Sequence, residues 1–188
     1  MQDKTENKTL NDISLIAMSD VDIHKYLPNI RIVKYSDLVD YNSISDLLPK
    51  QRDAVILLTE QVEGYGHWTA IIRYKNKIIY YDSIGFRVDK ATSWCKTKQL
   101  RKELGEDVPH LSLLLNKALD EGFKVVFNEF EFQNKKANLS TCGRWCCAVI
   151  SYFMQSKTPS LKGFYNVIMN LSKQWELDKE LVVCKIFP

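Results

Sequence analysis

The feature that most constrains the fold is a nearly unbroken apolar run that begins at Cys142 and continues to Phe153. Its length suits about three turns of helix, and Asn138, Ser140 or Thr141 can cap the first turn. Because the run is apolar on almost every side, it predicts a helix that passes through the interior of the protein. A thiol at the start of such a helix faces the positive end of the helix dipole, which favours the reactive thiolate.

The composition is that of an ordinary globular protein. The chain has 188 residues, 45% of them hydrophobic, so we expect one domain over 1–188 with a substantial core and a disordered tail at 1–10. The net charge of +3 does not indicate a nucleic-acid-binding protein, although weak association with a polyanion stays open. Five cysteines without paired spacing indicate free thiols in a reducing intracellular compartment. The first residues are polar and no apolar run approaches ~20 residues, so we expect neither a signal peptide nor a membrane partner.

The order of the expected elements indicates an α+β protein, with a mostly antiparallel central sheet, flanking helices and the buried core helix. Apolar and β-branched runs predict strands at about 54–59, 68–74 and 77–82, one or two strands within 123–132, and an edge strand at 181–187. Capping and stop signals predict helices at about 20–26, 36–41, 92–105, 109–121 and 142–153, and one of about a dozen residues from 159 onward.

A cysteine nucleophile needs a base, and His67 is the candidate. It stands at a strand start after a glycine-rich approach, whereas His24 and His110 fall on predicted helices. If residues 75 and 76 form a two-residue hairpin turn, His67 and Asp82 share one face as diagonal neighbours, with Cβ atoms roughly 7–8 Å apart. Asp82 could then accept a hydrogen bond from the imidazole and fix its tautomer. A shift of the turn by one residue would place the two side chains on opposite faces.

An acyl-transfer reaction also needs donors for its oxyanion. The N–H of Cys142 lies at the expected helix start, and Gln133 in the preceding polar loop could add a side-chain amide. We interpret Cys146 and Cys147, one turn inside the helix, as buried apolar residues.

Taken together, these residues resemble the adenovirus-type cysteine proteases, the adenain family, and more loosely the SUMO- and ubiquitin-like-protein proteases. The resemblance covers roughly 54–158, which would be the catalytic core of an adenain-like fold. It rests on four motifs in the family's order: Gly66-His67-Trp68, the segment 80–86, Gln133 and the segment 142–147. A weaker likeness, at 19–23, is to proteases of virophages and Polinton-like viruses.

The resemblance implies a role for each matching position. Cys142 would attack the scissile carbonyl, His67 would act as general base and then general acid, and Asp82 would orient His67. Gln133 would complete the oxyanion hole, while Trp68, beside the catalytic pair, and Gly143 would contact substrate. The interval from Gln133 to Cys142 is longer than the family usually shows, so the loop must bulge, or Asn134 or Asn138 supplies the amide instead.

The family further implies a cysteine endopeptidase that processes viral capsid or other structural precursors through a thioester, at Gly-containing sites. It would work in the virion and in the infected-host cytoplasm or viral factory. Two alternatives stay open: a protease that removes SUMO or ubiquitin from host proteins, and an inactive protease-fold module that binds or acts as a scaffold.

No cofactor is expected, although the family resemblance leaves room for an activating peptide or DNA. Cys95 could form a disulfide with such a peptide, and the helix that carries it would be basic, through Lys96, Lys98, Arg101 and Lys102. A metal site is not expected, because Cys-x-x-x-Cys-Cys beside one histidine is not zinc-finger spacing.

Overall fold

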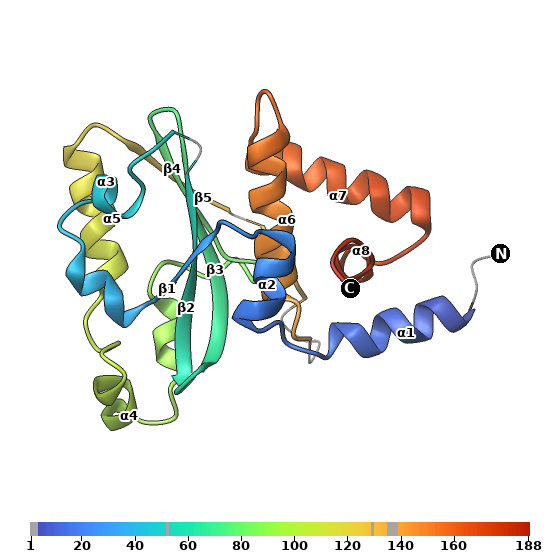
Figure 1. The fold of residues 1–188 in the computed structure, drawn as a ribbon, viewed down its shortest axis with the longest axis horizontal. Coiled ribbons are helices and arrows are strands. Elements are labelled where there is room, and N and C mark those ends of the chain that lie inside the picture. The colour runs from blue at the N-terminus through green and yellow to red at the C-terminus, as the bar shows by residue number, and fades with distance from the viewer. Residues whose placement is uncertain (1–3, 52, 129, 135–138) are drawn as a thin grey trace. The chain divides into compact units, whose positions relative to one another are not determined.

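The computed structural model describes residues 4–51, 53–128, 130–134 and 139–188, and the α+β class expected from the sequence is confirmed (Figure 1). The domain consists of two compact units, each interrupted in sequence. Unit 1 comprises Met1–Asn29, Ser83–Gly85 and Glu129–Pro188, and unit 2 comprises Ile30–Asp82 and Phe86–Asn128. The expected catalytic core therefore contributes residues to both units.

Unit 2 is built on a five-stranded sheet in which the strands follow their order in the chain. The strands are β1 (Arg31–Lys34), β2 (Ala54–Val62), β3 (Tyr65–Tyr74), β4 (Lys77–Tyr81) and β5 (Lys124–Phe127). The three central strands are antiparallel, whereas β1 and β5 each run parallel to their neighbour. The sheet is therefore mixed, and the expected antiparallel pairing holds at its centre. Parallel edge strands arise because long connections containing helices lead into β2 and β5.

The register of the β3–β4 hairpin is the one that the sequence predicts. Tyr74 pairs with Lys77, and Ala70 pairs with Tyr81. Lys75 takes a left-handed conformation, with φ of 55°, as a two-residue hairpin turn requires. This register places Asp82 directly after β4, on the expected face.

Short helices pack against the sheet within unit 2. They are η1 (Ser36–Asp40), α3 (Ile44–Leu47), η2 (Lys90–Trp94), α4 (Lys98–Glu103) and α5 (His110–Asp120). A core of aliphatic side chains joins α3 and α5 to one face of the sheet, and includes Leu47, Leu57, Ile71, Ile78 and Leu114. Burial of these side chains stabilises the unit by roughly 1.5–3 kcal/mol for each.

Two expectations for unit 2 are wrong in detail. The single helix expected at 92–105 is two short helices, because Thr97 rather than Thr92 caps α4 by accepting the Leu100 N–H at 3.0 Å. Thr92 instead donates to the Asp89 carbonyl oxygen at 2.8 Å. Of the run 123–132, where one or two strands are expected, β5 takes only Lys124–Phe127.

Unit 1 is helical. Its helices are α1 (Lys4–Ser14), α2 (Asp20–Tyr26), α6 (Cys142–Gln155), α7 (Leu161–Trp175) and α8 (Lys179–Ile186). α6 is the buried core helix that the sequence predicts, beginning at Cys142. The centroid of the Trp145 ring on α6 lies 5.5 Å from that of the Phe132 ring and 6.2 Å from that of the Phe164 ring. Aromatic packing therefore fixes the helix within this unit.

The ends of the chain differ from expectation. The segment expected to be a disordered tail forms α1 from Lys4 onward, and its Leu10 is buried where α1 packs with α8. The segment expected to be an edge strand forms α8, in which three consecutive residues, Val182, Val183 and Cys184, are buried. A short apolar run of this kind does not distinguish a strand from a buried helix.

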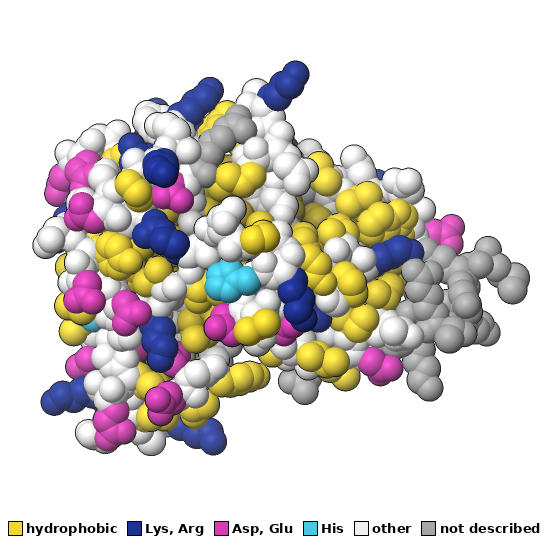
Figure 2. All heavy atoms as spheres, in the orientation of Figure 1, with side chains coloured by type: hydrophobic (Ala, Val, Ile, Leu, Met, Phe, Trp, Pro, Cys, Tyr) yellow, Lys and Arg dark blue, Asp and Glu magenta, His cyan; other side chains and the backbone are white. Residues whose placement is uncertain are grey.

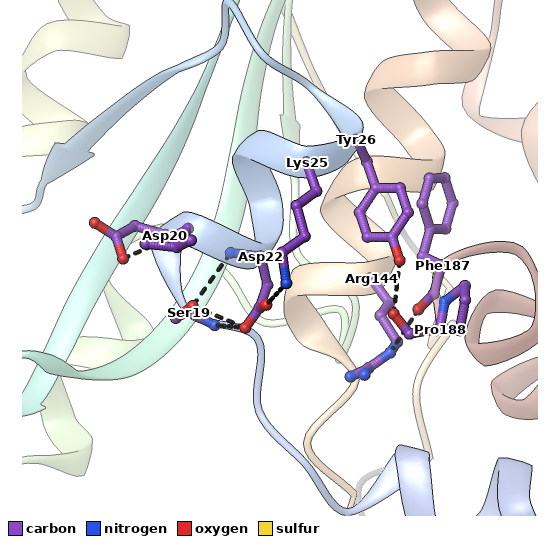
Figure 3. Close-up of polar contacts among 9 residues, drawn as sticks. Ser19, Asp20, Asp22, Lys25, Tyr26, Arg144, Phe187 and Pro188 are labelled. Carbon is purple, nitrogen blue, oxygen red and sulfur yellow. Dashed lines mark hydrogen bonds and ion pairs between the residues drawn. The ribbon is translucent and has the colours of Figure 1, made fainter.

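The start of α2 is fixed by a reciprocal capping box (Figure 3). The Ser19 hydroxyl oxygen accepts the Asp22 N–H at 3.2 Å, while the Asp22 carboxylate accepts the Ser19 N–H at 3.1 Å. Lys25 donates to the same carboxylate at 2.7 Å. The helix expected at 20–26 therefore begins and ends where the sequence indicates.

A buried arginine on the core helix holds both terminal segments of unit 1 (Figure 3). Arg144 donates from Nε to the Phe187 carbonyl oxygen at 2.9 Å and from Nη1 to the Ile16 carbonyl oxygen at 2.7 Å. The Tyr26 hydroxyl donates to the Pro188 carbonyl oxygen at 2.6 Å. A buried guanidinium is costly unless it is hydrogen-bonded. The carbonyl groups of Ile16 and Phe187 therefore stabilise Arg144 in its buried position on α6.

Candidate active site

His67 and Asp82 form a buried hydrogen-bonded pair in unit 2. His67 lies in β3 opposite Thr59, and its Nε2 atom is 3.1 Å from Oδ2 of Asp82. Only 3% of the His67 side chain and 0% of the Asp82 side chain are exposed. A carboxylate that is this close and shielded from water fixes the imidazole tautomer and stabilises the imidazolium form. The hydrogen bond that the hairpin register predicts is present.

Asn128, which the sequence reasoning missed, supports this pair. Its side-chain carbonyl accepts the Asp82 N–H at 2.9 Å, and its amide nitrogen donates to the Asp82 carbonyl oxygen at 2.6 Å. Asn128 follows directly after β5, which is parallel to β4, so the two residues meet at the same edge of the sheet. The available signal was a polar residue within the run expected to be strand at 123–132, which marks where β5 ends at Phe127.

Gly66 is required by a close approach of two strands next to His67. A Cβ atom at this position would overlap the Thr59 carbonyl oxygen and lie 2.8 Å from Cα of Glu60. The glycine therefore allows the β2 backbone to pass directly beside β3 at the position before His67.

The aromatic ring against His67 comes from Trp94. The ring centroids of His67 and Trp94 are 5.1 Å apart, with an interplanar angle of 64°. Trp68, the expected neighbour, follows His67 in β3 and so points to the opposite face of the sheet. Sequence reasoning missed Trp94 because it lies in a loop with a short 3₁₀ helix.

Cys142 is the first residue of α6 in unit 1, and 8% of it is exposed. The Trp145 N–H bonds back to the Thr141 carbonyl oxygen at 3.0 Å, so the amides of Cys142 and Gly143 precede the first hydrogen bond of the helix. Thr141 occupies the N-cap position of α6 without a side-chain cap hydrogen bond, and Ser140 lies one residue before it. Asn138 lies outside the described residues.

Gln133, also in unit 1, is buried and has a defined side-chain orientation. Its Oε1 atom accepts the Ser83 hydroxyl at 3.0 Å, and its Nε2 atom donates to the Leu139 carbonyl oxygen at 3.0 Å. The Gln133 N–H also donates to the Ser83 carbonyl oxygen at 2.7 Å. The Nε2 group carries a second N–H that can serve another acceptor. Asn134, the alternative donor, is exposed, whereas only 5% of Gln133 is exposed.

The four predicted catalytic residues are therefore divided between the two units, and the hydrogen bond between His67 and Asp82 joins two of them. His67 and Asp82 belong to unit 2, and Cys142 and Gln133 belong to unit 1.

The five cysteines all lie in the described part of the chain, and none of them forms a disulfide. Burial raises the pKa of Cys147 to about 12 and that of Cys184 to about 11, so both thiols are neutral at physiological pH. Cys146 and Cys147 are fully buried in α6, as expected for apolar positions. Cys95 ends η2, half-buried, and burial raises its pKa as well.

In 4–51, 53–128, 130–134 and 139–188, no group of three His, Cys, Asp or Glu side chains could hold a metal ion. Lys96, Lys98 and Lys102 are exposed around α4, but on the face drawn in Figure 2 basic and acidic side chains are interspersed over unit 2. Association with DNA stays a prediction.

A buried carboxyl pair lies at the end of β2, one residue beyond the partner of His67. The Glu106 Oε1 atom accepts the Glu60 N–H at 2.6 Å, while the Glu60 carboxylate accepts the Gly64 N–H at 2.6 Å and pairs with Lys34 at 3.2 Å. Only 2% of Glu106 is exposed. Burial raises the pKa of Glu106 to about 7, and the neighbouring Glu60 carboxylate adds to the shift.

We expect Glu106→Gln to raise the free energy of unfolding relative to wild type, and to do so by on the order of 2 kcal/mol more at pH 8 than at pH 5. Since the folded-state pKa lies above the ordinary 4.5, the stability from this group is present below pH 4.5 and is lost as the pH rises to about 7. Glutamine cannot ionise, so it avoids this loss. Thermal melts of wild type and variant from pH 4 to 8 measure the effect, with the exposed Glu103→Gln as control. Parallel stability curves for wild type and Glu106→Gln would contradict it.

Comparison with known proteins gives one clear relative. No family model matches the chain. Over 141 residues it is 36% identical to a protein of Sputnik virophage named Uncharacterized protein V9, and the aligned region covers 74% of this chain and 78% of the relative. The chain belongs to the family of V9. Membership in the V9 family supports the viral origin that the sequence indicates. In the described ranges of this chain, no helix is both long and apolar enough to cross a bilayer.

Proposed function

We propose that this protein is a cysteine endopeptidase that processes viral structural precursors. Cys142 is the nucleophile, His67 the general base and acid, Asp82 the residue that orients His67, and Gln133 an oxyanion donor. The observation that carries the proposal is the buried hydrogen bond of 3.1 Å between His67 and Asp82, because such a pair is what activation of a thiol requires.

The direction of the hydrogen bond in this pair suits the role of His67 as a base. With the Nε2–H of His67 donating to Asp82, the Nδ1 lone pair is the one that can accept a proton. The hydrogen bond to Asp82 stabilises the imidazolium that results.

A covalent link joins the residues on which the proposal depends. Asp82 and Ser83 are consecutive residues, and Ser83 holds Gln133 through two hydrogen bonds of 2.7 and 3.0 Å. One peptide bond therefore connects the residue that orients the base with the residue that orients the oxyanion donor. In the proposed enzyme, the Cys142 thiol transfers its proton to His67.

The reaction then follows from these groups. The Cys142 thiolate attacks the scissile carbonyl carbon, and the carbonyl oxygen becomes an oxyanion that accepts hydrogen bonds from Gln133 Nε2–H and from the Cys142 N–H. The tetrahedral intermediate collapses to a thioester as the C–N bond breaks, and the His67 imidazolium protonates the leaving amine. Water, deprotonated by His67, attacks the thioester and releases the acid and the thiol.

Viral precursors are the favoured substrates because the chain belongs to a family with a virophage member. The test is co-expression of the protein with virophage capsid proteins, followed by identification of new termini by mass spectrometry. We expect cleavage at Gly-containing sites, with no cleavage by the Cys142→Ala variant. Cleavage of SUMO or ubiquitin conjugates, with capsid proteins left intact, would instead favour a protease of ubiquitin-like modifiers.

Gln133→Ala should lower kcat by about 10²–10³-fold and leave KM nearly unchanged, because an oxyanion donor acts in the transition state. Steady-state kinetics on a fluorogenic peptide derived from a mapped cleavage site measures this. The control is Asn134→Ala, which alters the exposed neighbouring amide. If Asn134→Ala were the more damaging of the two, the oxyanion donor would be Asn134.

A further inference from the structure

η2, the short helix that precedes Cys95, is fixed at its start by an unusual residue. Asp89 adopts a left-handed conformation with φ of 63°, which is unfavourable for a residue other than glycine. Its carboxylate accepts the Tyr35 hydroxyl at 2.6 Å, the Ser112 N–H at 3.3 Å and the Ser112 hydroxyl. Burial, followed by the hydrogen bond to Asp89, raises the pKa of Tyr35 above its usual range, so its hydroxyl remains a donor. These bonds hold the strained backbone in place.

The same segment is fixed at its far end. The Cys95 thiol donates to the Glu60 carbonyl oxygen at 3.1 Å, which ties the residue after Trp94 to the end of β2. Between the two anchors, Ala91 and Thr92 are buried. The position of Trp94 is therefore determined from both sides, within one unit.

The Trp94 side chain contacts the proposed base, His67. The centroid of the Trp94 ring lies 5.1 Å from that of the His67 ring, with an interplanar angle of 64°. It also lies 5.1 Å from the centroid of the Phe86 ring, with an interplanar angle of 70°. Both contacts have the edge-to-face geometry that aromatic rings prefer. An imidazole can rotate about its terminal torsion unless a neighbour prevents it.

We infer that η2, anchored through Asp89 and Cys95, presents Trp94 as a positioning residue that holds the His67 imidazole against Asp82 and keeps water away from their hydrogen bond. Its importance for catalysis rests on the proposed function, but the restraint on the ring does not. The packing of β2 against η2 is also a contact between fixed elements, so the restraint is present before substrate binds.

The test compares Trp94→Ala with the conservative Trp94→Phe. In NMR spectra of ¹⁵N-histidine-labelled protein, we expect the His67 Nε2–H proton to exchange slowly with water in wild type and about tenfold or more faster in Trp94→Ala. Trp94→Phe should restore most of the protection. In the peptide assay, Trp94→Ala should lower kcat by about 10- to 100-fold with KM within about twofold. Melting curves establish that each variant is folded.

A second variant tests the anchor. Asp89→Ala removes the acceptors for Tyr35 and Ser112, and we expect the exchange of the His67 proton to accelerate in the same direction as in Trp94→Ala. Unchanged proton exchange in Trp94→Ala would overturn the inference, whatever the activity. Accelerated exchange in a protein that cleaves no peptide would leave the inference standing and remove the proposed function.

Discussion

Cys142→Ala will abolish peptide-bond hydrolysis, lowering kcat by about 10⁶-fold, close to the uncatalysed background. The expected loss is this large because, in the proposed reaction, the Cys142 thiolate forms the covalent bond to substrate, and the buried thiols of Cys147 and Cys184 are not suited to replace it. Burial holds the thiols of Cys147 and Cys184 neutral, with pKa values of about 12 and 11. Cleavage of the mapped peptide under single-turnover conditions measures the loss.

The matched control is Cys184→Ala, which removes a buried thiol from α8 and should leave the cleavage rate unchanged. A thiol-directed probe provides a second readout, since peptide mapping should find label at position 142 in wild type and none at this position in Cys142→Ala. Wild-type cleavage by Cys142→Ala would assign the nucleophile elsewhere. A wild-type protein that neither cleaves peptides nor reacts with the probe would favour the alternative of an inactive binding module.

The parts of the site that could be predicted are those controlled by local patterns. The hairpin register followed from a two-residue turn between two β-rich runs, and it placed Asp82 beside His67. The start of α6 at Cys142 followed from an apolar run behind small polar residues. In both cases one short stretch of sequence determines the geometry, so no distant contact was needed to infer it.

The parts that were missed depend on contacts between distant segments. Asn128 binds the backbone of Asp82, 46 positions earlier, and Trp94 meets His67 through a loop whose shape depends on Asp89 and Tyr35. Neither contact leaves a periodic signal in the sequence. The same reason explains α1 and α8, whose helical structure depends on packing against each other in unit 1.

Mixed pairing in the sheet was missed for a related reason. Whether an edge strand is parallel depends on the path of the chain between strands, and β1 and β5 are each only four residues long. Strands this short carry little patterning of their own. Their parallel pairing nevertheless matters for the site, because it brings Asn128 to the edge where Asp82 lies.

His67→Ala will also abolish turnover, and Asp82→Asn will lower kcat by a smaller but still large factor, on the order of 10⁴. Removing the imidazole removes the only proposed group that takes the thiol proton and later gives it to the leaving amine. In Asp82→Asn the amide can donate to Nε2, so the proton is expected at Nδ1, the nitrogen that must accept it from Cys142. Far-UV circular dichroism and melting curves establish that both variants are folded.

Alkylation of Cys142 by iodoacetamide tests the same pair without a substrate. If the imidazole takes the thiol proton, the rate at pH 6 should fall by about tenfold or more in His67→Ala, and in Asp82→Asn it should lie between that of His67→Ala and wild type. The control is His110→Ala, which alters a histidine at the start of α5 that takes no part in the proposed reaction. Equal alkylation rates in wild type and His67→Ala would show that the imidazole does not act on the thiol, and the proposed nucleophile and base would then belong to different sites.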